Sequence, residues 1–158
     1  MKYILLGFAL CAFGWAQEKT KYDGPVPPKP DIPYLLHAAN LIPTEVVQAS
    51  QSDKKGDMVY SITGATSPAK TPLAEPIFLI EADKLNPDHI ELYRLDSKGS
   101  QREITIARKA KRNSRPLRLM VSHIQGRLYK LEVAQTLENG EYSLSPADSN
   151  EAFCFTVF

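Results

Sequence analysis

The chain has 158 residues, 19 Lys and Arg against 18 Asp and Glu, and a hydrophobic content of 43%. This length suits one ordinary domain, and a domain of this size buries enough apolar surface to fold without a disulfide or a metal. The formal net charge of +1 provides no general electrostatic field for nucleic acid, so we expect no nucleic-acid partner.

The first sixteen residues have the composition of a secretory signal peptide. Lys2 supplies a positive charge, an apolar run follows from Tyr3 to Phe13, and Gly14 and Ala16 are small residues suited to a cleavage site. The apolar run is too short to cross a bilayer, which takes about 20 residues. We therefore predict cleavage after Ala16 and a secreted or periplasmic product that does not span the membrane.

Residues 17–33 form a proline-rich spacer. Five prolines fall within this range, and each fixes φ and removes a backbone donor. Such a segment favours extended polyproline II over sheet or helix. We expect it to separate the cleavage site from a single folded domain at residues 34–158.

From residue 34 onward the pattern is typical of an all-β domain. Short apolar or alternating runs are separated by Gly, Pro, Asn and Asp, which favours a sandwich of antiparallel sheets. We predict a single immunoglobulin-like (or related) β-sandwich. The expected strands cover residues 58–63, 77–80, 90–95, 104–106, 117–121, 128–133, 141–144 and 153–158.

Two turns and one unassigned segment complete this prediction. Residues 96–99 (DSKG) have turn composition, and Asn139-Gly140 has the residues that a tight hairpin turn favours. Residues 34–51 are compatible with a strand or a short helix.

Cys154 is the only cysteine left after removal of the signal peptide, because the other is Cys11. Strand alternation places Phe153, Phe155 and Val157 on one face of the last strand and Cys154 on the other. We expect the aromatic face to point into the core and the thiol to be buried and unreactive.

The familiar catalytic and metal-binding patterns are weak in this sequence. Ser67 and Lys70 match an S-x-x-K pair, but the surrounding prolines disfavour the helix that this pair requires, so a surface loop is expected. The acidic pairs lack the ligand run of a calcium loop. We predict no catalytic residue, cofactor or metal site. The histidines, at His37, His89 and His123, follow no metal-binding spacing.

The strongest local anomaly is a basic run between two expected strands. We predict a protruding basic hairpin there, which offers an anion-binding surface to acidic polysaccharide, lipopolysaccharide or an acidic protein. The competing interpretation is a loop whose solvated charges only maintain solubility. The candidate anion-binding residues are Arg108, Lys109, Lys111, Arg112 and Arg115.

Residues 27–37, 139–146 and 152–155 resemble a group of uncharacterised secreted bacterial proteins. The resemblance extends over most of the mature chain and implies export but no particular activity. Residues 140–144 (GEYSL) are also similar to the penultimate strand of many immunoglobulin-like extracytoplasmic modules, which implies a fold class alone.

The expected function is a secreted, non-catalytic binding or structural module of the bacterial cell envelope, with its ligand left open. The alternative is a small secreted hydrolase whose site is assembled through space. A concave pocket in which a histidine lies close to a Ser, a Cys or a paired carboxylate would favour the enzyme. A basic ridge or an exposed edge strand without a pocket would favour the module.

Overall fold

The computed structural model describes residues 21–106, 115–147 and 149–158. Within these residues the chain forms two sheets and one 3-10 turn, η1 (Pro87–His89). The smaller sheet has the strand order β10 (Leu119–Gln125), β11 (Leu128–Val133), β7 (Ile77–Glu81), β1 (Tyr34–His37) and β2 (Asn40–Pro43).

The larger sheet contains the remaining strands. Its order is β3 (Glu45–Gln48), β13 (Glu151–Val157), β12 (Gly140–Pro146), β8 (Ile90–Lys98), β9 (Gln101–Ile106), β5 (Asp57–Thr63) and β4 (Ser50–Lys54). The short strand β6 (Lys70–Thr71) pairs with β13 in parallel, whereas the other ladders are antiparallel.

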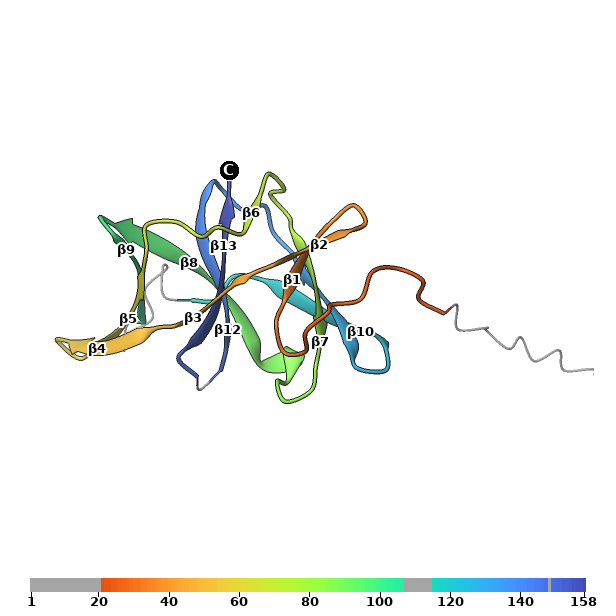
Figure 1. The fold of residues 1–158 in the computed structure, drawn as a ribbon. Helices are drawn as coiled ribbons and strands as arrows, with labels where there is room; N and C mark the ends of the chain where they lie inside the picture. The colour runs from red at the N-terminus through yellow and green to blue at the C-terminus, as the bar shows by residue number, and fades with distance from the viewer. Residues whose placement is uncertain (1–20, 107–114, 148) are drawn as a thin grey trace, which may run out of the picture.

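The predicted all-β sandwich is confirmed, because the two sheets pack face to face over a shared core. Figure 1 shows β12 and β13 between the group β4, β5 and β9 on one side and β1, β7 and β10 on the other. The core between the sheets is closely packed, with the rings of Phe78 and Phe155 4.9 Å apart in an edge-to-face arrangement. It takes Leu35, Phe78, Ile80 and Leu131 from the smaller sheet, and Ile90, Leu92, Leu144, Phe153 and Phe155 from the larger one.

The larger sheet also closes on itself, which the sequence analysis did not predict. β3 and β4 lie at opposite ends of the strand order, yet only Ala49 separates them along the chain. Residues 45–54 therefore pair with β13 through their first half and with β5 through their second. We call this closed arrangement of β3, β13, β12, β8, β9, β5 and β4 the rolled sheet.

Closure gives the domain a second interior, and β13 is consequently buried on both faces. The predicted alternation is confirmed, since Phe153 and Phe155 belong to the core between the sheets and Cys154 faces the other way. Cys154 is 0% exposed because it lies inside the rolled sheet. This second apolar cluster contains Ala49, Ile62, Leu95, Ile104, Ala152 and Cys154.

One end of the rolled sheet is filled by an ion cluster around Arg102 of β9, whose side chain is 0% exposed. Its guanidinium donates two hydrogen bonds to the Glu45 carboxylate, at 2.7 and 3.1 Å, and others to the carbonyl oxygens of Gly64 and Thr63. The carboxylate of Glu141, on β12, lies 3.6 Å from the Arg102 guanidinium. Burial lowers the pKa of Arg102, but the hydrogen bonds to Glu45 and the nearby charges of Glu45 and Glu141 together outweigh it, so that the pKa is raised overall.

The loop before β6 supplies the remaining partners of this cluster. The Glu141 carboxylate accepts hydrogen bonds from the Thr66 hydroxyl at 2.8 Å, the Ser67 backbone N–H at 2.9 Å and the Thr156 hydroxyl at 2.8 Å. Each charge therefore has several partners, which is the condition under which a buried ion cluster is tolerated.

Three local predictions need correction. Asn139-Gly140 is not a tight hairpin turn, because β11 and β12 belong to different sheets and β12 pairs with β8 and β13. The predicted turn at residues 96–99 is displaced, since β8 continues to Lys98 and pairs there with Gln101. The strands that flank the basic run, β9 and β10, do not pair as a hairpin either, because they also lie in different sheets. At Asn139-Gly140, turn composition identified a break without indicating which strands become neighbours.

The segment that the sequence left open, residues 34–51, is entirely strand and turn. It holds β1, β2, β3 and the start of β4. Ala38 has φ 54° in the turn between β1 and β2, where the two strands pair antiparallel. The segment therefore contributes to both sheets.

Part of the proline-rich segment lies against the domain. The Asp31 carboxylate accepts hydrogen bonds from the backbone N–H groups of residues 83–85, between 2.9 and 3.1 Å. The Pro33 carbonyl accepts one from the Thr44 hydroxyl at 2.7 Å. These contacts fix the direction in which the chain enters β1.

We expect Arg102→Met to lower the free energy of unfolding by about 3–5 kcal/mol, because it leaves the buried Glu141 carboxylate and the half-buried Glu45 carboxylate without their counter-charge. Urea denaturation of residues 17–158 measures this. Arg94→Met is the control, since Arg94 forms a solvent-exposed pair with Glu138 and its loss should barely move the midpoint. A similar small shift for both variants would contradict the structural role of the cluster.

Candidate functional site

The end of the rolled sheet opposite the ion cluster contains a cavity of about 100 Å³. Its walls come from β5, β8, β9, β12 and β13, together with the turn that joins the last two. The apolar lining consists of Ala49, Ile62, Leu95, Ile104, Ile106 and Ala152. We call this the end cavity.

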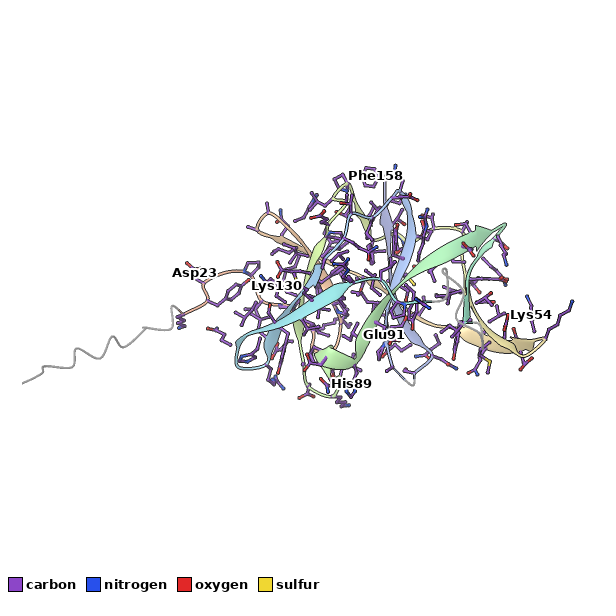
Figure 2. All side chains as sticks on the ribbon, turned by 180° about the vertical axis from the view of Figure 1, so that it is seen from behind. Asp23, Lys54, His89, Glu91, Lys130 and Phe158 are labelled. Atoms are coloured by element: carbon purple, nitrogen blue, oxygen red, sulfur yellow. The ribbon has the colours of Figure 1, made fainter. Side chains whose placement is uncertain are left out.

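Polar groups are gathered in the lining of the end cavity. Tyr93 donates a hydrogen bond to the Glu91 carboxylate at 2.5 Å, and Glu91, labelled in Figure 2, is exposed on β8. Tyr60 and Glu151 also line the cavity. Within the described part of the chain, neither the Tyr60 hydroxyl nor the Glu151 carboxylate has a hydrogen-bond or ion-pair partner.

The electrostatic character of the lining is acidic. Among the described residues, the charged groups that line the cavity are Glu91 and Glu151, without a Lys, Arg or His. Burial raises the pKa of Tyr93, and the hydrogen bond to Glu91 raises it further. The Tyr93 hydroxyl therefore stays protonated at physiological pH and continues to donate to Glu91.

Below the cavity the interior contains hydroxyl and thiol groups. Ser143 and Ser145 on β12 line the cavity, and their hydroxyl oxygens lie 2.7 Å apart. Ser143 pairs across the ladder with Cys154. Burial raises the pKa of the Cys154 thiol to about 12, so at neutral pH this group is an uncharged thiol and a poor nucleophile.

The predicted anion-binding residues are largely beyond what the structure describes. Arg108, Lys109, Lys111 and Arg112 lie outside the described residues, and Arg115 is exposed. Their role as an anion-binding surface stays a prediction.

The weak catalytic patterns do not converge on the end cavity. Ser67 was expected in a surface loop, but it is 0% exposed and its hydroxyl donates to the Cys154 carbonyl at 3.1 Å. Lys70 is exposed on β6, so the S-x-x-K pair does not share a site. The histidines are dispersed over other elements, namely His37 on β1, His89 in η1 and His123 on β10.

Two other features are absent from the described ranges. The His, Cys, Asp and Glu side chains form no group of three or more suited to a metal ion. No helix in the described part of the chain is long and apolar enough to cross a membrane.

The sequence analysis missed the residues of the end cavity, although alternation indicated their faces. On β8, strand alternation places Ile90 and Leu92 on one face and Tyr93 and Leu95 on the other. The second face was given no particular role, but closure of the sheet turns it inward. The site could have been predicted from strand alternation only if it had also been known that residues 45–54 pair with both ends of the sheet.

No protein family, no curated protein and no solved structure gives a match to this chain. The end cavity is therefore interpreted from its own chemistry.

The Cys154 thiol should react slowly with a thiol-labelling reagent in the native protein and quickly in denaturant, because it is 0% exposed and its pKa is raised. Mass spectrometry of labelling with and without urea tests this. Ionisation of the thiol in the unfolded chain above its ordinary pKa should also make stability fall as the pH rises from about 9 to about 12. Fast labelling of the native protein would place the thiol at the surface instead.

Proposed function

We propose that the chain is an exported, non-catalytic binding module of the bacterial cell envelope, and that the end cavity is its ligand site. Export rests on the signal peptide predicted at residues 1–16, with the mature chain beginning at Gln17. Binding rests on one observation: charged side chains fill one end of the rolled sheet, and a cavity opens at the other end.

The lining of the end cavity supports a small amphipathic ligand. A largely apolar pocket with a few convergent polar groups is the usual form of a small-molecule site. Its volume of about 100 Å³ is below that of an engineered cavity of about 150 Å³ that holds benzene. The buried part of the ligand is therefore no larger than a small ring or a branched alkyl group.

The alternative, a small hydrolase, receives less support from the same residues. Hydrolysis by a serine requires a base within hydrogen-bond reach of the hydroxyl. The Ser143 and Ser145 hydroxyls hydrogen-bond to each other, and no described histidine lines the cavity. We retain the binding module as the proposal.

We expect small apolar probes to bind in the end cavity of the mature chain. Titration with isobutanol and 3,3-dimethyl-1-butanol, followed by ¹H–¹⁵N NMR, should shift the signals of Ile62, Leu95 and Ile104, which line the cavity. Tyrosine fluorescence offers a second readout, because the single tryptophan is Trp15 in the predicted signal peptide.

A variant that fills the cavity provides the control. Ile106→Phe enlarges a half-buried lining residue and should abolish these shifts, whereas Met120→Phe on the smaller sheet should leave them unchanged. Thermal unfolding of both variants confirms that they fold. If none of the probes perturbs the cavity residues, the end cavity is not a ligand site and this proposal fails.

The basic run provides a separate prediction about an anionic partner. If it binds acidic polysaccharide or lipopolysaccharide, affinity should fall steeply as salt increases, because exposed charges are screened over about 8 Å at physiological ionic strength. Lys109→Ser, Lys111→Ser and Arg112→Ser together should weaken binding without changing stability. Equal binding of the triple variant and the native chain at low salt would leave the run as a solubility device.

A further inference from the structure

We infer that the end cavity selects a small organic cation, a substituted ammonium group on a short apolar stem. This inference rests on the proposed function and names its ligand class. It is carried by two tyrosines, two carboxylates and the dimensions of the cavity.

The aromatic residues provide the first argument. Tyr60 and Tyr93 both line the cavity, from β5 and β8, the two strands that flank β9 in the wall. The face of an aromatic ring carries negative partial charge and attracts a cation within about 6 Å. A pair of tyrosines in one small cavity is the arrangement that favours an alkylated ammonium group over a neutral group of equal shape.

The carboxylates provide the second argument. Glu151 lines the cavity without a hydrogen-bond or ion-pair partner among the described residues, and Glu91 accepts from an uncharged tyrosine. Neither charge is therefore neutralised by a described cation of the protein. The positive side chains that the structure describes lie elsewhere; for example, Lys54 is at the outer tip of the β4–β5 turn (Figure 2).

The dimensions provide the third argument. A cavity of about 100 Å³ admits the head of such a ligand, while the open end leaves its stem in water. The apolar floor of Leu95, Ile62 and Ile104 contacts the alkyl substituents. A strongly hydrated ion such as sodium would lose its water shell there without recovering enough ligands.

Choline and 3,3-dimethyl-1-butanol test this inference, because they have the same shape and differ by one positive charge. Titration of the mature chain by NMR and calorimetry should show choline binding about tenfold more tightly, which corresponds to a strong cation–π contribution. The shifts should again be centred on the lining residues. If choline instead shifts the NMR signals of residues elsewhere on the surface, the assignment is contradicted.

Two variants separate the contribution of the carboxylate charge to choline affinity from that of the tyrosine rings. Glu151→Gln and Tyr60→Leu should each lower the affinity for choline severalfold, while binding of the neutral alcohol changes little. Glu132→Gln is the matched control, because Glu132 lies on β11 of the smaller sheet and pairs with Lys130. An equal effect of Glu132→Gln would indicate a general effect of net charge and overturn the inference.

The outcomes distinguish the inference from the proposed function. If the neutral alcohol binds as tightly as choline, the cavity is a ligand site but does not select a cation. If neither compound binds, both the ligand site and its specificity fail. The triple serine variant of the basic run adds one more test: removing positive charge should leave choline affinity unchanged or raise it, and a fall would contradict an acidic site.

Discussion

The pairing of residues 45–54 with both β13 and β5 is the constraint on which the rest of the structure depends. An open sheet of this size would expose two edges, whereas a strand shared by both ends removes them. Closure also determines which side chains are enclosed. Every polar residue that alternation turns to the inner face must then find a partner or line a cavity.

Arg102 is the clearest consequence of this constraint. Its side chain has no route to water, so the strand that carries it must lie where Glu45 and the carbonyls of Thr63 and Gly64 surround the guanidinium. Glu141 is satisfied in turn by the loop before β6. The cluster links β3, β9, β12 and the β5–β6 connection, and it closes one end of the interior to ligands.

The same interior changes character along its length. The charged side chains around Arg102 fill one end, and an apolar layer with Cys154 occupies the middle. Tyrosines and carboxylates line the other end. A group that enters the open end meets an acidic, aromatic lining before an apolar floor. This order is the physical basis for proposing a ligand with a cationic head, because no described positive side chain offsets the two carboxylates.

The sequence by itself determined the β class and most of the strands, because alternation and turn residues act over a few positions. It also determined the two faces of β13, with Phe153 and Phe155 opposite Cys154. The tertiary structure alone decided which strands are neighbours. The Asn139-Gly140 pair marked a break but not a hairpin, since pairing depends on residues far apart in the chain. Closure of the sheet buried Arg102 and assembled Tyr60, Tyr93 and Glu151 around one cavity, and no local pattern contains that information.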